Sequence, residues 1–172
     1  MLNFARLQAG RVEYELVPVA LAELVHELDP MIAPQVTSRS LAYVVEVDGS
    51  HVVLADRMKL MQVLLNLLSN AVKFTLPGGR VSVECVDRAD GTGDAGTVFI
   101  RVSDTGIGIA NDRSSAIFEP FVQVDASPAG RAAGAGLGLA ISRDLVRGMG
   151  GELRVRSTLG VGTSFTISLP RA

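Results

Sequence analysis

The stretch Asp104-Thr105-Gly106-Ile107-Gly108-Ile109 has two alternate glycines separated by an aliphatic residue, and the stretch Gly134-Ala135-Gly136-Leu137-Gly138-Leu139 has a similar pattern. Alternate glycines let the backbone turn tightly and bring its N–H groups close to a ligand, while the aliphatic side chains anchor the loop in a core. One such loop would mean little, because glycine-rich turns are common. Two of them, preceded by an asparagine-bearing helix at 66–74, indicate a nucleotide site.

Length and composition predict one compact domain. The 172 residues are 48% hydrophobic, which is enough to bury a sizeable core. The net charge of −2, without a run of Lys or Arg, argues against a general nucleic-acid-binding protein, which needs a concentrated basic surface. The first residues lack the order of a signal peptide, and no apolar run approaches the ~20 residues of a membrane span. We therefore expect a cytoplasmic domain without membrane contact, and leave open whether a longer parent is anchored in a membrane.

Hydrophobic periodicity predicts alternating strands and helices. Strands are expected at 12–17, 41–47, 51–54, 81–86, 97–102, 152–156 and 164–169, and helices at 20–35, 56–74 and 136–149. Pro30 and Pro34 should bend or end the first helix, and Asp56 should cap the second. Residues 90–94 read as a hairpin loop. The order of elements predicts an α+β fold, a two-layer α/β sandwich in which about three helices cover one face of a mixed, mostly antiparallel sheet.

Residues 122–133 are rich in small side chains and follow no period. Few of these side chains could hold the segment down, so we interpret it as a mobile lid. The plainer alternative is a solvated surface loop, because many loops serve only as connections.

The long helix carries a polar stripe opposite its aliphatic stripe, made of Gln62, Asn66, Asn70 and Lys73. The ordinary explanation of such a stripe is a solvated helix face. An amide oxygen is, however, a suitable hard ligand for Mg²⁺, which keeps several waters and takes further ligands from phosphates. A lysine one turn onward could then meet those phosphates.

Four segments together resemble the sequence boxes of sensor histidine kinases. They are Asn66–Thr75 for the asparagine box, Asp104–Ile109 for the first glycine box, Ile117–Phe121 for the phenylalanine box and Gly134–Leu139 for the second glycine box. The C-terminal glycines, with Ser157, Phe165 and Leu169-Pro170, are also similar to the family pattern. All arrive in the family's order over most of the chain. The resemblance implies the Bergerat-type ATP-binding fold shared with gyrase-type topoisomerases, mismatch-repair proteins and heat-shock chaperones.

The resemblance implies a role for each matching residue. Asn70 would ligate Mg²⁺, and Asp104 would accept a hydrogen bond from the adenine amino group, which guanine lacks at that position. Gly136 and Gly138 would present backbone amides to phosphate oxygens at a helix start. The expected ATP-binding residues are Asn66, Asn70, Lys73, Phe74, Asp104, Gly106, Gly108, Ile109, Arg131, Gly134, Gly136, Leu137, Gly138, Leu139 and Thr163.

Three further residues of the boxes carry expectations of their own. Phe118 and Phe121 are expected to be packing residues that seat the lid. Ala135 stands where the family usually has Thr or Ser, so one possible hydroxyl contact is missing. We expect weaker phosphate binding from this departure, not its loss.

Position 66 favours phosphoryl transfer over hydrolysis. In the ATP-hydrolysing relatives a glutamate stands one helical turn before the magnesium asparagine, and here that place is Asn66, whose amide cannot act as a general base. The resemblance therefore implies a domain that holds Mg–ATP and donates its γ-phosphoryl group to a histidine on a dimerisation domain, upstream of a response regulator. An ATPase of the gyrase and chaperone class, and a non-catalytic nucleotide-binding regulatory module, remain the alternatives.

The acceptor histidine is not expected within the chain. The segment from His26 to Pro30 superficially resembles a phosphoacceptor box, but Asp29 occupies its basic position and the proline comes one residue early. We interpret His26 as an ordinary helix histidine, and His51, for which we expect no acidic partner nearby in the sequence, as structural. Residues 2–10 resemble the end of a dimerisation helix. We expect that helix end and linker at 1–10, a catalytic ATP-binding domain at 11–172, and the acceptor before Met1.

Overall fold

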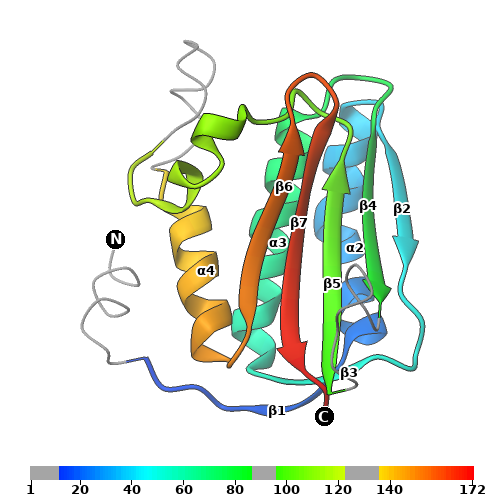
Figure 1. Cartoon of the computed structure of the whole chain (residues 1–172). Helices are drawn as coiled ribbons and strands as arrows, with labels where there is room; N and C mark the ends of the chain where they lie inside the picture. The colour runs from blue at the N-terminus through cyan, green and yellow to red at the C-terminus, as the bar shows by residue number, and fades with distance from the viewer. Residues whose placement is uncertain (1–11, 87–95, 123–135) are drawn as a thin grey trace.

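The computed structural model describes residues 12–86, 96–122 and 136–172, which form two layers (Figure 1). One layer is a five-stranded sheet, and the other contains α2 (Leu21–Ser38), α3 (Arg57–Phe74) and α4 (Gly138–Gly148). All three helices lie on the same face of the sheet (Figure 1). The predicted α+β sandwich is confirmed.

The main sheet is mixed and mostly antiparallel, in the order β2-β4-β5-β7-β6. Its strands are β2 (Ala42–Glu46), β4 (Arg80–Val86), β5 (Thr97–Asp104), β6 (Glu152–Thr158) and β7 (Gly162–Pro170). The β2–β4 pair is parallel, and the other three pairs are antiparallel. A second, two-stranded antiparallel sheet joins β1 (Val17–Ala20) to β3 (Val52–Ala55). Two short 3₁₀ turns, η1 (Asn111–Arg113) and η2 (Ala116–Phe118), follow β5.

The core lies between the helices and the sheet. Side chains alternate along β5, so Val98, Ile100 and Val102 are buried. The buried face of α3 repeats at helical spacing through Leu60, Val63, Leu64, Leu67, Leu68, Ala71 and Val72. This packing holds α3 rigidly beneath the sheet, so that side chains on its other faces have fixed positions.

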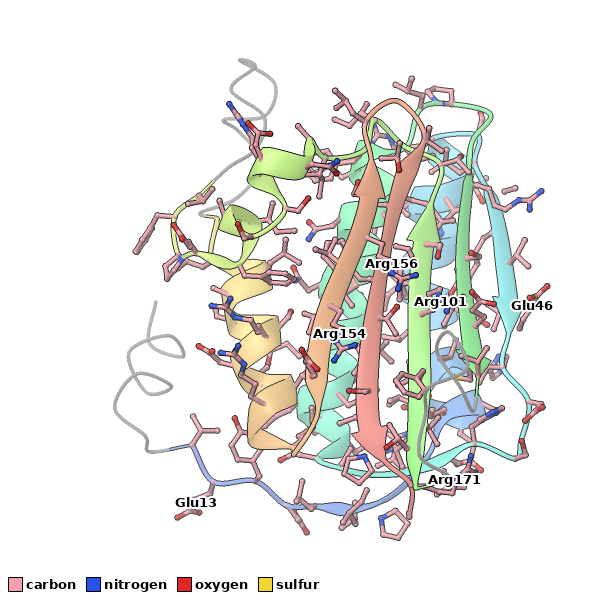
Figure 2. All side chains as sticks on the ribbon, in the orientation of Figure 1. Glu13, Glu46, Arg101, Arg154, Arg156 and Arg171 are labelled. Atoms are coloured by element: carbon pink, nitrogen blue, oxygen red, sulfur yellow. The ribbon has the colours of Figure 1, made fainter. Side chains whose placement is uncertain are left out.

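The opposite face of the main sheet is polar. Figure 2 shows Arg101, Arg154 and Arg156 on this face, on β5 and β6. Arg101 Nη1 donates to Glu84 Oε1 at 2.9 Å, across the β4–β5 pair. Such a charged face favours water over a second packed layer.

Both ends of α3 are capped. At its start, Asp56 Oδ1 accepts a hydrogen bond from Lys59 N at 3.1 Å, which confirms the predicted N-cap. At its end, Arg39 Nη1 donates to the carbonyl oxygens of Val72 at 3.0 Å and Lys73 at 2.7 Å. No backbone N–H group of the helix donates to these two carbonyl oxygens, and the arginine supplies the hydrogen bonds instead. The last turn of α3 is therefore well anchored.

The predicted position of the first strand is wrong, and of the two effects expected of Pro30 and Pro34, bending or ending the first helix, the ending does not occur. The strand lies at Val17–Ala20, not at 12–17, because the chain before it bonds to side chains: Glu15 N donates to Asp56 Oδ2 at 3.2 Å. Pro30 and Pro34 do not end the first helix, which continues to Ser38. The apolar residues that α2 buries beside and beyond these prolines offset the lost backbone hydrogen bonds.

Phe118 is buried, with its ring centroid 6.3 Å from that of Phe165 in an edge-to-face arrangement, so its packing role is confirmed. Phe121 is 65% exposed, and the lid that it is expected to seat lies outside the described residues beyond Val122, so its role in seating the lid stays a prediction. Its φ of 66° marks a sharp backbone turn at that point.

Several expectations fall on parts of the chain without a described structure. The hairpin loop at 90–94 lies outside the described residues, as does the interpreted lid at 122–133 except for Val122. Across the described part of the chain, no helix has the length and apolar character that crossing a lipid bilayer requires.

Candidate functional site

The polar face of α3 turns toward α4 and is not fully solvated. Asn66, Asn70 and Lys73 are each half-buried, and only Gln62 of the stripe is exposed. Asn66 Nδ2 donates to Ser142 Oγ on α4 at 3.0 Å. The ordinary explanation of the stripe, a face turned wholly to water, therefore holds for Gln62 alone.

Gly138, the first residue of α4, lies directly against Asn66. A Cβ atom built at position 138 would lie 2.5 Å from Asn66 Oδ1, closer than real Cβ contacts. A side chain at position 138 would have to displace the Asn66 amide or push α4 away from α3. Glycine at this position thus lets the Asn66 side chain lie against the start of α4.

Asn70 lies one turn after Asn66 on the same helical face. Lys73 follows, with Nζ 4.5 Å from the centroid of the Phe74 ring in a cation–π contact. The amide of Asn70 and the cation of Lys73 thus belong to the anchored last turns of α3, where an anionic ligand would meet both.

Asp104 ends β5 and is more than half buried. Its Oδ1 accepts a hydrogen bond from Gly106 N at 2.8 Å. Burial raises the pKa of this carboxyl above its usual range, against the opposing effect of the backbone N–H groups of Gly106 and Thr163. A buried carboxylate fixed by backbone donors can read the amino edge of a base with a defined orientation.

The first glycine cluster is held between α3 and the β6–β7 turn. Ile107 N donates to Phe74 O at 3.2 Å, and Gly160 N donates to Ile107 O at 2.7 Å. A Cβ at Gly106 would overlap Phe74 O, and one at Gly108, where φ is +69°, would overlap Thr158 O. The two glycines are needed for this close approach, which joins the asparagine-bearing helix to Asp104.

Hydroxyl groups of β6 and β7 hold the end of the first glycine cluster by hydrogen bonds. Ile109 N donates to Ser157 Oγ at 2.7 Å, and Ser157 Oγ lies 2.8 Å from the hydroxyl of Thr163. Thr163 is also opposite Asp104 in the β5–β7 register. The three expected site residues Ile109, Thr163 and Asp104 therefore lie in one bonded group.

The second glycine cluster ends where α4 begins. Leu137 is the N-cap, and among the described residues no side chain donates or accepts a capping bond there. Gly136, with φ +67°, accepts from Phe121 N at 3.0 Å, while Leu139 packs against the core. The first N–H groups of an α-helix have no intrahelical acceptor and carry its positive dipole end. This turn can therefore receive an anion.

The structure brings together most of the predicted residues and leaves two of them, Arg131 and Gly134, outside the described part, together with the neighbouring Ala135. Contacts join Asn66 to Gly138, Phe74 to Gly106, and Asp104 to Gly106 and Thr163. Ser142 was missed from the sequence, although its position one turn after Gly138 places it on the same face of α4.

The two histidines differ in environment. The His26 side chain is 86% exposed on α2, with Nδ1 3.1 Å from Asp29 Oδ2, as expected of a surface helix histidine. His51 is buried, and its Nδ1 lies 2.9 Å from Asp48 Oδ1, so the expectation that it has no acidic partner nearby is wrong. The backbone carbonyl of His51 also accepts from Leu21 N at 3.0 Å, in keeping with a structural role.

A metal ion at this site would depend on its substrate for ligands. Across residues 12–86, 96–122 and 136–172 no group of three or more His, Cys, Asp and Glu side chains could hold a metal. Asn70 offers one amide oxygen, a hard ligand that suits Mg²⁺. Because Mg²⁺ keeps several waters and commonly binds phosphates, a single protein oxygen fits this ion when a polyphosphate is present.

Comparison with known proteins identifies the family. Residues 55–172 match the family model described as histidine kinase-, DNA gyrase B-, and HSP90-like ATPase. The autoinducer 2 sensor kinase/phosphatase LuxQ of Vibrio parahaemolyticus is 36% identical over 172 residues, which cover 99% of this chain and 20% of LuxQ. The chain thus spans about a fifth of the length of LuxQ and of two similar curated relatives.

Solved structures agree. The crystal structure of full-length ShkA in complex with AMPPNP has a TM-score of 0.83 and 38% identity, covering 99% of this chain and 34% of ShkA. A nucleotide-free catalytic domain of histidine kinase ThkA has a TM-score of 0.76 and 25% identity, covering 91% of this chain and 98% of that domain. The resemblance to histidine kinase catalytic domains is confirmed, and the chain belongs to the family of histidine kinase-, DNA gyrase B-, and HSP90-like ATPases.

Proposed function

We propose that this chain is the catalytic domain of a sensor histidine kinase, which binds Mg–ATP and presents its γ-phosphoryl group to a histidine on a dimerisation domain. The observation that carries the proposal is the amide of Asn66, held at the α3–α4 junction between Ser142 and Gly138. An amide in this place cannot take a proton from water. The site can bind a nucleotide and has no general base there for hydrolysis.

Adenine would bind at Asp104. The carboxylate is fixed by Gly106 N at 2.8 Å, and it can accept a hydrogen bond from an exocyclic amino group. Guanine would place an oxo group against this acceptor, so the site selects adenine. The AMPPNP held by the similar ShkA structure supports an adenine nucleotide as the ligand of this chain.

The triphosphate would extend from Asp104 toward α4. The first turn of α4, capped by no side chain of the described part, offers backbone N–H groups and a positive dipole end to phosphate oxygens. Lys73 supplies a cation, and Asn70 an oxygen for Mg²⁺. The ion, when bound, neutralises charge on the phosphates. Arg131 and Gly134 are proposed as further phosphate contacts by their place in the sequence boxes.

The domain would act by positioning its substrate. Phosphoryl transfer needs an in-line approach and neutralised charge more than covalent chemistry from the protein. The chain's own groups do this by holding the base at Asp104 and the phosphates at α4. The nucleophile would come from a dimerisation domain, with residues 1–10 as the linker and 11–172 as the catalytic domain, and a response regulator would receive the phosphoryl group. The sensor-kinase names of the relatives support these partners.

The test is to mix this chain with a phosphoacceptor hairpin from the parent kinase and ATP labelled on the γ-phosphate. The expected product is acid-labile, base-stable label on a hairpin histidine, and Asn70→Ala should abolish it. Steady release of free phosphate without label on the hairpin would indicate an ATPase instead. Binding of Mg–ATP with neither product would indicate a non-catalytic nucleotide-binding module.

A further inference from the structure

We infer that Ser142 is a positioning residue of the nucleotide site, which ties α4 to α3 through the amide of Asn66 and thereby sets the affinity for the triphosphate of Mg–ATP. The inference rests on the proposed function. It concerns a residue outside the four sequence boxes, since Ser142 lies three positions beyond Leu139, where the second glycine cluster ends.

Ser142 is 2% exposed, and a buried hydroxyl needs a hydrogen-bond partner. The described partner is the side chain of Asn66, whose Nδ2 donates to Ser142 Oγ at 3.0 Å across the two helices. A small apolar side chain at this buried position would need no hydrogen-bond partner. A serine here therefore points to a specific polar connection between α3 and α4.

Both ends of the Asn66 amide lie against α4. Nδ2 is bonded to Ser142, while Oδ1 is the nearest atom to the place that a Cβ of residue 138 would occupy, at 2.5 Å. Gly138 and Ser142 are one helical turn apart, so they form one surface of α4. The amide is thus inserted against this surface with a fixed orientation.

The orientation also suits the charge of α4. The first turn of α4, without a side-chain cap in the described part, carries the positive end of the helix dipole, which favours an oxygen over an N–H group. A reversed amide would direct its N–H group at this turn. The bond to Ser142 holds the favourable orientation, because it occupies the Nδ2 end.

The consequence for nucleotide binding is geometric. The proposed phosphate groups of the site come from both helices: Asn70 and Lys73 from α3, and the backbone N–H groups of the first turn from α4. A triphosphate that contacts both needs a constant spacing between them. The Ser142–Asn66 bond fixes that spacing, whereas Asp104, which would hold adenine, lies on β5 and does not depend on it.

The experiment measures two affinities for each variant of this chain, for Mg–ATP by calorimetry and for adenosine by NMR titration. Ser142→Ala should lower the affinity for Mg–ATP roughly three- to tenfold, the value of one hydrogen bond, and change the affinity for adenosine less than about twofold. Ser142→Thr, which keeps the hydroxyl, should restore most of the Mg–ATP affinity. Ser168→Ala is the matched control. It removes a hydroxyl on β7 that accepts a hydrogen bond from the backbone N–H of Glu152.

A double substitution shows whether Ser142 acts through Asn66. In an Asn66→Ala background, Ser142→Ala should produce no further loss of Mg–ATP affinity, since the connection is already absent. Equal losses for Mg–ATP and adenosine, or an undiminished effect in the Asn66→Ala background, would reduce Ser142 to a general structural role and overturn the inference. An unchanged Mg–ATP affinity in Ser142→Ala would overturn it as well. Failure of the unsubstituted chain to bind Mg–ATP would overturn the proposed function together with the inference.

Discussion

Single residues decide both the specificity and the stability of this site, and Asp104 affects the two in opposite directions. Its carboxylate is more than half buried, bonded to Gly106 N at 2.8 Å, and burial raises its pKa. A buried acceptor that carries charge makes a stronger hydrogen bond than a neutral one, but its ionised form is disfavoured by desolvation.

The first prediction concerns binding. Asp104→Asn should weaken ATP binding by more than ~1 kcal/mol, because a charge-assisted hydrogen bond to the adenine amino group is lost. Calorimetric titration of both proteins at neutral pH measures this difference. Equal affinity of the two proteins would remove Asp104 from the nucleotide site.

The second prediction concerns stability. Since the pKa of Asp104 is raised by folding, the folded state holds its proton more tightly than the unfolded state, and the ionised carboxylate opposes folding at pH above its folded pKa. In the absence of nucleotide, Asp104→Asn should therefore raise the melting temperature at pH 7. This gain should shrink as the pH falls through the folded pKa and Asp104 becomes protonated. A variant that melts below the unsubstituted protein at pH 7 would contradict this account.

The third prediction separates backbone angle from close approach. Gly108 (φ +69°) and Gly160 (φ +77°) share the left-handed region, but a Cβ at Gly108 would overlap Thr158 O, while one at Gly160 meets no described atom within 4 Å. Gly160→Ala should cost about 1 kcal/mol of unfolding free energy, from its backbone angle alone. Gly108→Ala should cost at least ~2 kcal/mol, because a steric overlap is added. Equal costs in denaturant unfolding would show that the loop does not depend on contact with β6.

The sequence motifs indicated where glycine is needed, but not every reason for it. Gly106 and Gly108 were expected to bring backbone N–H groups close to a ligand, and the structure shows in addition that each is needed for a close approach to a carbonyl oxygen of the chain itself, that of Phe74 or that of Thr158. The Asp48–His51 pair and Ser142 were missed. Asp48 and His51 are only three residues apart, so the sequence did contain this acidic neighbour, whereas the bond between Ser142 and Asn66 depends on which helix packs against α4.

At the scale of elements, the long helix was the most predictable part of the chain. Its aliphatic stripe and the Asp56 cap predicted a helix at 56–74, and α3 covers Arg57–Phe74. The segment at 12–17 was less predictable because its alternating pattern arises from a different cause. There, Tyr14 lies over Gly148 of α4 and Glu15 N bonds to Asp56, so the alternation reflects packing against helix ends and not a sheet.

The fourth prediction tests how that segment is attached. A Cβ at Gly148 would overlap the ring of Tyr14, and Lys59 Nζ lies 5.0 Å from the centroid of the same ring. Gly148→Ala should destabilise the protein by about 1–3 kcal/mol, because the added methyl displaces the ring. In a Tyr14→Ala background the same change should be nearly neutral, since the space is then open.

Denaturant unfolding of the four proteins in this cycle measures the coupling between the two positions. Tyr14→Phe is the matched control, because it keeps the ring and removes only the hydroxyl. A Gly148→Ala cost that persists without the Tyr14 ring would show that residues 12–16 are not attached to α4 in this way.

At the scale of the whole molecule, the fold serves to bring distant segments to one site. Four segments that are far apart in the chain meet at this site: the asparagine-bearing turns of α3, the end of β5, the β6–β7 turn and the first turn of α4. Hydrogen bonds made by Asn66, Phe74, Asp104 and Gly160 join them. The sequence boxes predicted which segments take part, because each box has a local pattern. Their mutual geometry depends on the sheet order β2-β4-β5-β7-β6, which no single box contains.

These segments are proposed to form, together, one site for Mg–ATP. The most direct measurement is a calorimetric titration of this chain with ATP in the presence of Mg²⁺, with Asp104→Asn as the comparison. The account predicts saturable one-site binding with a dissociation constant between about 1 μM and 1 mM, the range typical of enzyme substrates, and weaker binding by the variant. No detectable binding, or equal binding by both proteins, would contradict it.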